Sequence, residues 1–215
     1  MTALFITFEG LDGSGKSTHL QKAFHWLEDN GVECQVAQEP GGTPLGEAIR
    51  EVFLDPRWGE IDGTVEALMV FASRRQHLLE VIEPALAEGR HVICDRFTDS
   101  TYAYQGHGRG VPVSILREVD RVATGGRVPD RTLLFDLPAD MARQRGHSEA
   151  RRDSEEGVTR LDAEALEFYG KVRQGYLELA QEHPDRFVVI RSEGTFESTQ
   201  QQVRSALGEI FNLEK

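Results

Sequence analysis

The 215-residue sequence contains few cysteines, no long apolar run and no excess of positive charge. Its two cysteines, Cys34 and Cys94, lie far apart and beside apolar residues, which predicts buried, reduced thiols rather than a disulfide. No run approaches the roughly 18 apolar residues that a transmembrane helix needs. The first residues do not have the pattern of a signal peptide, in which a basic segment precedes a long apolar one. We therefore expect no secretion, no membrane insertion and a cytoplasmic location.

The charge balance disfavours a broad surface for nucleic acids. The chain has 24 lysines and arginines against 36 aspartates and glutamates, a formal net charge of −12. Counterion release on a polyanion needs many clustered cations, so we expect no nucleic-acid partner, although a small basic pocket for one phosphate compound remains compatible. A hydrophobic fraction of 39% and a charged fraction of 28% are typical of a folded globular protein.

Short β-branched runs alternate with segments of helical periodicity along the whole chain. Strands are expected at residues 3–9, 33–38, 91–94, 132–136 and 187–190. Helices are expected at residues 17–30, 44–54, 64–87 (bent near Pro84), 99–104, 112–124, 162–181 and 196–211, with a further short helix after the fourth strand. The alternation predicts an α/β fold with a mainly parallel sheet covered by helices on both faces. Residues 1–215 fit a single domain.

The strongest chemical signal is the segment Gly10–Ser17, which reads GLDGSGKS. It matches G-x-x-x-x-G-K-[ST], follows an apolar strand and opens a helix, the context that a phosphate-binding P-loop requires. Glycines let backbone N–H groups converge on phosphate oxygens, Lys16 reaches the β- and γ-phosphates, and Ser17 can hold Mg²⁺. The residues expected to bind a nucleoside triphosphate are Gly10, Leu11, Asp12, Gly13, Ser14, Gly15, Lys16, Ser17 and Thr18.

Further polar residues follow the second and third strands. Glu39–Thr43 and Asp95–Phe97 fall at the carboxyl edge of the sheet, where open α/β folds bind ligands. The N-K-x-D signature expected of a regulatory GTPase does not occur in the sequence. A P-loop together with separate arginines indicates a site for two phosphate compounds. Kinases of several nucleotides or nucleosides remain open at this point, as does a non-catalytic nucleotide switch.

Five segments, in order, make the sequence similar to bacterial thymidylate kinases of the P-loop nucleoside-monophosphate kinase group. They are FEGLDGSGKST (8–18), EPGGT (39–43), the helix 66–84 with Arg74, DRFTDSTYAYQG (95–106) and RLDAEALEFYGKVRQGY (160–176). The resemblance implies a three-layer P-loop fold with five parallel strands in the order 2-3-1-4-5. It also implies transfer of the ATP γ-phosphoryl group to dTMP with Mg²⁺, giving dTDP for dTTP synthesis, and a homodimer.

The resemblance assigns roles to residues of the acceptor site. Arg50 and Arg96 would clamp the dTMP phosphate, and Arg74 would reach the thymine base. Phe71 would form an aromatic wall against thymine, although many relatives place that wall one position earlier, where this chain has Val70. Further acceptor-site residues are Asp12, Glu39, Ser100, Thr101 and Tyr104.

Several of these residues have more specific implied roles. Tyr104 would pack against the 2′ carbon of the sugar, and Asp12 would lie near the 3′ hydroxyl. Ser17 and Asp95 would be the metal-binding residues. Gln38 replaces an arginine common in the family.

A polar lid is expected at about residues 143–160, mobile in the empty enzyme and closed over two bound nucleotides. Gly13 stands where one subgroup of the family carries a catalytic arginine, so the lid must supply that group. Arg145 is the first candidate, Arg160 the second and Arg143 the third, whereas Arg151 and Arg152 lie in a stretch longer than the family's usual lid. With Lys16, Arg96 and Asp12, the arginines Arg145 and Arg160 complete the expected catalytic set.

Overall fold

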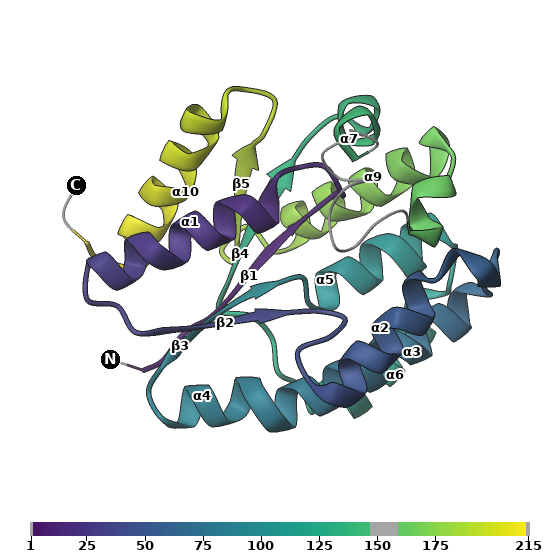
Figure 1. The fold of residues 1–215 in the computed structure, drawn as a ribbon, viewed down its shortest axis with the longest axis horizontal. Coiled ribbons are helices and arrows are strands. Elements are labelled where there is room, and N and C mark those ends of the chain that lie inside the picture. Colours follow the sequence, from purple (N-terminus) through teal and green to yellow (C-terminus); the bar gives the residue numbers. More distant parts are fainter. Residues whose placement is uncertain (1, 147–158, 214–215) are drawn as a thin grey trace.

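The computed structural model describes residues 2–146 and 159–213. A five-stranded sheet with the order β2-β3-β1-β4-β5, parallel at every pairing, forms its centre (Figure 1). The strands are β1 (Phe5–Gly10), β2 (Cys34–Gln38), β3 (His91–Asp95), β4 (Arg131–Asp136) and β5 (Phe187–Arg191). The predicted strand order is confirmed.

Helices cover both faces of the sheet, as the alternating pattern predicts. The α-helices are α1 (Lys16–Asp29), α2 (Pro44–Leu54), α3 (Gly63–His77), α4 (Glu83–Ala87), α5 (Thr98–Thr101), α6 (Val113–Thr124), α7 (Ala139–Gly146), α9 (Leu166–Glu182) and α10 (Phe196–Phe211). Helices α1 and α10 pack together on one face, and α4, α5 and α9 lie on the other (Figure 1). No helix in residues 2–146 and 159–213 is long and apolar enough to cross a membrane.

Side chains along β1 point alternately to the two faces of the sheet, and each face has its own apolar cluster. Ile6 and Phe8 point into the apolar cluster beneath α1 and α10, whereas Phe5 packs in the cluster beneath α4. Since side chains alternate along a strand, Glu9 shares the face of Phe5. A carboxylate therefore enters the interior one residue before the P-loop begins, where its exposed fraction is 0%.

Helices begin where predicted when a capping side chain bonds to the backbone of the first turn. Helix α2 begins where predicted because Thr43 accepts a hydrogen bond from the backbone N–H of Gly46 at 3.0 Å and Pro44 occupies the first helical position. The long helix expected at residues 64–87 is instead interrupted by a π-helical turn at Leu78–Ile82. Pro84 has no N–H to donate, and the widened turn lies immediately before it.

Two other predicted helices differ at their ends. After α5, the chain continues as a π-helical segment, Tyr102–Gly108, beyond the predicted end at residue 104. The helix expected from residue 162 begins as a separate 3₁₀ turn, Arg160–Ala163, and α9 starts only at Leu166. A further 3₁₀ turn, Pro56–Trp58, follows α2. Residues 147–158, which include most of the expected lid with Arg151 and Arg152, lie outside the described residues.

Candidate active site

The P-loop connects β1 to α1 in a backbone conformation that its glycines permit. Gly13 and Gly15 have φ angles of +83° and +85°, in the left-handed region. A Cβ atom added to Gly13 would lie 2.3 Å from the carbonyl oxygen of Ala142, and one on Gly10 would lie 2.5 Å from that of Phe135. The loop therefore packs tightly against its neighbours and opens directly into the amino end of α1, which favours anion binding there.

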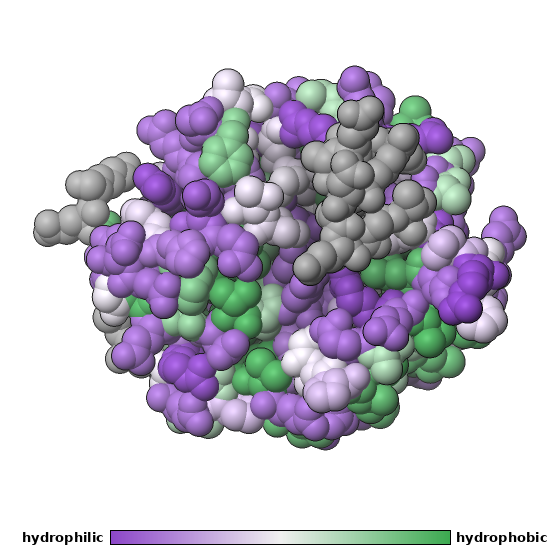
Figure 2. All heavy atoms as spheres, viewed as in Figure 1, coloured by the Kyte–Doolittle hydropathy of each residue, from purple (hydrophilic) through white to green (hydrophobic). Residues whose placement is uncertain are grey.

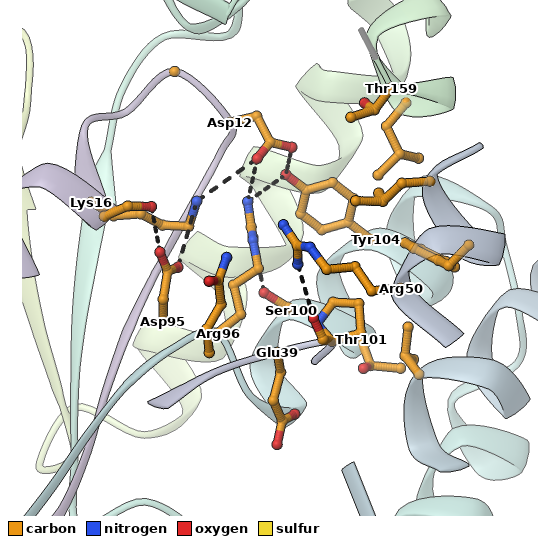
Figure 3. Close-up of a pocket in the computed structure, with 18 of the residues that line it drawn as sticks. Asp12, Lys16, Glu39, Arg50, Asp95, Arg96, Ser100, Thr101, Tyr104 and Thr159 are labelled. Atoms are coloured by element: carbon orange, nitrogen blue, oxygen red, sulfur yellow. Dashed lines mark hydrogen bonds and ion pairs between the residues drawn. The ribbon is translucent and has the colours of Figure 1, made fainter. Parts of the chain in front are cut away.

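Lys16 lies between two carboxylates at the base of the pocket (Figure 3). Its ammonium nitrogen is 3.8 Å from Asp12 Oδ1 and 3.7 Å from Asp95 Oδ1. Burial, followed by the positive charge of Arg96, lowers the pKa of Lys16, and the two carboxylates act in the opposite direction. The arrangement holds the lysine at the phosphate-binding loop with partners that an incoming phosphate can replace.

Ser17 and Asp95 lie together, as the sequence predicts for a metal-binding pair. The Ser17 hydroxyl donates to Asp95 Oδ2, and Asp95 Oδ1 is buried without a hydrogen-bond partner in the described residues. Hydroxyl and carboxylate oxygens are the hard ligands that Mg²⁺ prefers, and Mg²⁺ often takes only one or two protein ligands beside phosphates and water. Within residues 2–146 and 159–213, no three His, Cys, Asp or Glu side chains form a metal-binding group. The pair therefore fits a metal that arrives with a nucleotide.

Arg96 occupies the centre of the site in a conformation rare for a side chain with a Cβ. Its φ angle is +73°, in the left-handed region. Its Nη2 atom donates to Asp12 Oδ1 at 2.8 Å and to the Tyr104 hydroxyl at 3.2 Å, while Nη1 donates to the hydroxyls of Ser100 at 2.9 Å and Tyr176 at 3.0 Å. The guanidinium thus connects the P-loop to three aromatic or hydroxyl side chains from later elements.

Arg74 is fixed on the α3 side of the pocket. Its Nε donates to Glu39 Oε2 at 2.6 Å, and Nη1 donates to the Thr101 hydroxyl at 3.0 Å. Its guanidinium carbon lies 4.9 Å from the Phe71 ring centroid and 5.0 Å from that of Phe97. Only 2% of Arg74 is exposed, so its position is set before any ligand arrives.

One pocket contains most of the predicted residues. Arg50 enters it from α2 and donates to the carbonyl oxygen of Pro40 at 2.9 Å. The predicted residues that line the pocket are Asp12, Gly13, Gly15, Lys16, Ser17, Thr18, Glu39, Arg50, Arg74, Asp95, Arg96, Ser100, Thr101, Tyr104 and Arg145. The elements that supply them lie far apart in sequence and meet at the carboxyl edge of the sheet (Figure 3).

The P-loop residues Gly10, Leu11 and Ser14 are not among the lining residues, and two predicted side chains from other elements also lie outside the lining. Phe71 does not line this pocket: it packs in the cluster with Ala67, Val111 and Leu116, and Val70 faces the pocket instead. Packing of α3 against α6 turns Phe71 inward, where its ring supports Arg74, and its contact with thymine stays a prediction. Arg160 also lies outside the pocket lining.

The partners of Arg160 explain why it is not among the lining residues, and its catalytic role stays a prediction. Its Nη1 donates to Glu66 Oε1 at 2.7 Å, and its Nε donates to the Phe53 carbonyl at 3.2 Å. Arg109 shares the same glutamate at 3.0 Å. In this structure Arg160 is part of a buried ion cluster, whereas Arg145 lines the pocket and donates to the Ser192 carbonyl at 3.0 Å. Arg143 lies on α7 but not on this lining.

Several site residues were missed by sequence reasoning. Phe53, Leu54, Thr159 and Leu161 line the pocket. Gln105, which the resemblance covers without assigning it a role, also lines it and donates to Glu66 Oε2 at 2.8 Å. Glu9 and Tyr176 lie behind Arg96, joined by a hydrogen bond of 3.0 Å. For Glu9, the sequence offered only one indication, a charged residue at the end of an apolar strand. Tyr176 is the last residue of the segment 160–176, to which the family resemblance assigned no role.

Comparison with known proteins gives one consistent result. A family model described as thymidylate kinase matches residues 8–203. Similar curated proteins include the thymidylate kinase of Desulfosudis oleivorans, 42% identical over 213 residues (99% of this chain, 100% of the relative). That of Chromobacterium violaceum is 49% identical over 191 residues (86% and 84%), and that of Pseudomonas fluorescens is 42% identical over 215 residues (100% of both).

Proposed function

The chain belongs to the thymidylate kinase family, and we propose that it transfers the γ-phosphoryl group of ATP to dTMP, giving ADP and dTDP. The observation that carries this proposal is the contact between Arg96 and Asp12 at 2.8 Å. It brings an arginine from the acceptor side of the sheet edge onto the P-loop itself. Two phosphate groups bound at these two elements would therefore meet at one point.

The chemistry needs cations more than it needs a base. A nucleoside monophosphate has a second pKa of about 6, so at neutral pH its phosphate is largely a dianion and already a nucleophile. The difficulty is to bring two anions together and to stabilise charge on the transferring group. Lys16 would hold the donor phosphates, and Arg50 and Arg96 would hold the acceptor phosphate. Because Arg145 lies at the pocket, it is our candidate for the lid arginine that contacts the transferring group.

Mg²⁺ fits the pair Ser17 and Asp95. When bound, the ion would neutralise charge on the β- and γ-phosphate oxygens of ATP. The Ser17 hydroxyl now donates to Asp95, so binding requires it to turn its lone pair toward the ion. Lys16, 3.7 Å from the same carboxylate, offsets part of the negative charge that Asp95 would carry without an ion.

Acceptor selection would rest on Arg74, Thr101 and Tyr104. Arg74 packs against two rings, and its Nη1 and Nη2 atoms each have a second in-plane N–H that can be donated to a base. Tyr104 is 5% exposed and lines the pocket, so its ring can exclude a 2′ hydroxyl by contact. Val70 replaces an aromatic wall with a smaller apolar one, which still accommodates the methyl group of thymine.

A homodimer through α3 is part of the proposal. Exposed positions on this helix and its extension follow a repeat of three and four residues: Val65, Leu68, Ala72, Arg75 and Leu79. Val65, Leu68 and Leu79 are 47%, 51% and 52% exposed. Apolar side chains gather at the rim over α2, α3 and α6 (Figure 2). Such a seam packs against an identical helix in the manner of a coiled coil.

The cytoplasmic location stays a prediction.

A coupled assay of ADP release tests the activity. It compares dTMP, dUMP, UMP, CMP, GMP and AMP as acceptors with ATP and Mg²⁺. A dominant rate with dTMP supports the proposal, a different preferred acceptor identifies another nucleotide kinase, and ADP release that no acceptor accelerates identifies a nucleotide switch. Omission of Mg²⁺ in the same assay tests the metal requirement.

A further inference from the structure

Glu9 is a buried carboxylate behind the catalytic arginine that the proposed reaction does not use. Its Oε1 atom accepts from the backbone N–H of Phe97 at 2.7 Å. Its Oε2 atom accepts from the Ser100 hydroxyl at 2.6 Å and the Tyr176 hydroxyl at 3.0 Å. The same two hydroxyls accept from Arg96 Nη1. Glu9 and Arg96 are therefore joined through a layer of two oxygen atoms.

The protons of this layer can be counted. Each hydroxyl has one proton, and the two Nη1 protons of Arg96 point to the two hydroxyl oxygens. If Glu9 is ionised, both hydroxyls donate to Oε2 and both accept from Arg96, so every proton has an acceptor. The Ser100 and Tyr176 oxygens, 2.7 Å apart, then need no proton between them. With a proton on Oε2, one hydroxyl would accept from Glu9 and donate to the other hydroxyl across these 2.7 Å, so the layer would lose one of its two hydrogen bonds to a negative charge.

We propose that ionised Glu9 is a positioning residue, which fixes the Arg96 guanidinium at the acceptor phosphate through the hydroxyls of Ser100 and Tyr176. Arg96 needs such support because its backbone is in the left-handed region, where a side chain with a Cβ is not held by local preference. The inference rests on the proposed function in one respect, the assignment of Arg96 to the acceptor phosphate.

The charges around Glu9 decide the pH at which this support is present. Burial, and then the negative charge of Asp99 on α5, raise the pKa of Glu9 to about 7, while Arg96 and the hydrogen bonds from Ser100 and Phe97 lower it. Asp99 is itself paired with Arg186, 2.6 Å away beside β5, and Lys16 on α1 also interacts with Glu9.

The remaining neighbours of Glu9 stay protonated. Burial, and then the charge of Glu9, hold the pKa of Tyr176 on α9 well above its usual range. The pKa of Cys94 on β3 is also raised well above its usual range, chiefly by burial. Near neutral pH, Glu9 is therefore the group of this layer that changes charge.

The test compares wild type with Glu9→Gln and Tyr176→Phe. A glutamine cannot reproduce Glu9, because one side of the carboxylate accepts from a backbone N–H and the other from two hydroxyls, so its NH₂ group meets donors on either side. We expect Glu9→Gln to raise KM for dTMP and lower kcat, with kcat/KM reduced about 10- to 100-fold, and Tyr176→Phe to reduce it about 3- to 10-fold. KM for ATP should stay within about twofold of wild type.

Tyr102→Phe is the matched control. Its hydroxyl also donates to a half-buried carboxylate, Asp120, at 3.0 Å, but neither residue lines the pocket. We expect this variant to keep wild-type kinetics. The pH profile supplies a readout that simple loss of packing would not move. In wild type kcat/KM should fall as pH drops through about 7 and again near the substrate's own pKa of about 6, whereas Glu9→Gln should keep only the second step.

Removal of a negative charge behind Arg96 would by itself strengthen phosphate binding. Weaker binding of dTMP by Glu9→Gln therefore indicates loss of positioning and not a simple change of charge. If Glu9→Gln folds and binds dTMP as tightly as wild type or more tightly, with kcat and the pH profile unchanged, the inference is overturned. Calorimetric titration with dTMP and with thymidine tests whether Glu9 acts through the phosphate contact of Arg96. Loss of positioning should weaken the binding of dTMP but not that of thymidine, which has no phosphate. A wild-type enzyme that does not phosphorylate dTMP refutes the proposed function, and the Glu9→Gln comparison is then made with the acceptor that the assay identifies.

Discussion

The Tyr104 hydroxyl donates to Asp12 Oδ2 at 3.0 Å, which joins the π-helical segment Tyr102–Gly108 directly to the P-loop. Asp12 Oδ1 meanwhile accepts from Arg96 and lies 3.8 Å from the Lys16 ammonium group. One carboxylate therefore links Lys16 of the P-loop to Arg96 and Tyr104, for which we propose contacts with the acceptor phosphate and sugar. A substitution at one of these residues should therefore also alter the position of the others.

Tyr104 should separate two functions, one in its ring and one in its hydroxyl. Tyr104→Phe keeps the ring, so we expect dUMP to remain favoured over UMP while kcat falls about tenfold through loss of the Asp12 contact, in line with about 1.5 kcal/mol for a hydrogen bond to a charged group. Tyr104→Ala should also narrow the gap between dUMP and UMP. Kinetic comparison of both acceptors in both variants checks this, and an unchanged ratio after Tyr104→Ala would place the sugar discrimination elsewhere.

Lys16→Ala should leave the fold intact and reduce turnover by about 10³-fold or more, because the ammonium group meets charge on the transferring phosphate. Lys22→Ala is the control, since Lys22 is exposed on the same helix. Turnover and thermal unfolding measured on both variants distinguish the roles. A folded Lys16→Ala protein with near-normal turnover would contradict the donor-site assignment.

Arg145 and Arg160 should give different defects. Arg145 lines the pocket, so Arg145→Ala should lower kcat by about 10³-fold with little change in stability. Arg160→Ala removes a buried partner of Glu66, and we expect about 2 kcal/mol less free energy of unfolding, since Arg109 still neutralises that glutamate.

The control for both is Arg191→Ala, whose side chain is exposed at the end of β5. Urea unfolding and single-turnover rates check the two expectations separately. A large kcat defect in Arg160→Ala at unchanged stability would mean that this arginine leaves Glu66 and enters the site during turnover.

The part of the site that could be predicted from sequence is the part fixed by local chemistry. The P-loop has one backbone conformation, set by Gly13 and Gly15, and its residue types follow from phosphate binding. The parallel sheet follows from short apolar runs alternating with helices, and the strand order followed from the family resemblance. Arg50, Arg74 and Arg96 were located because the resemblance assigned them one by one.

The rest depends on contacts between distant elements. Val70 and Phe71 differ by about 100° around a helix, and only the packing of α3 on α6 decides which faces the pocket. Arg160 leaves the pocket lining because Glu66, 94 residues away, accepts from it. Periodicity also cannot distinguish an α-helix from the π-helical turn at Leu78–Ile82, because the apolar positions are nearly the same.

The exposed seam on α3 should hold the proposed dimer. Leu68→Asp places a charge in the middle of this seam, so we expect a monomer in sedimentation-velocity experiments at micromolar concentration. Val189→Asp is the control, since Val189 is 44% exposed on β5 at the edge of the sheet opposite β2. If wild type and Leu68→Asp sediment alike, the seam does not mediate assembly.

Glu9 should leave a signature in the pH dependence of stability. Its pKa is raised to about 7 in the folded protein, from 4.5 as the ordinary value, so the native state binds this proton more tightly than the unfolded state does. The stabilising contribution is therefore fully present below about pH 4.5 and is lost as pH rises toward 7, by about 3 kcal/mol in total. Glu9→Gln should lack this part of the slope between pH 4.5 and 7, whatever its absolute stability. Urea unfolding of both proteins across this range measures the difference, and parallel curves would show that Glu9 does not change its proton affinity on folding.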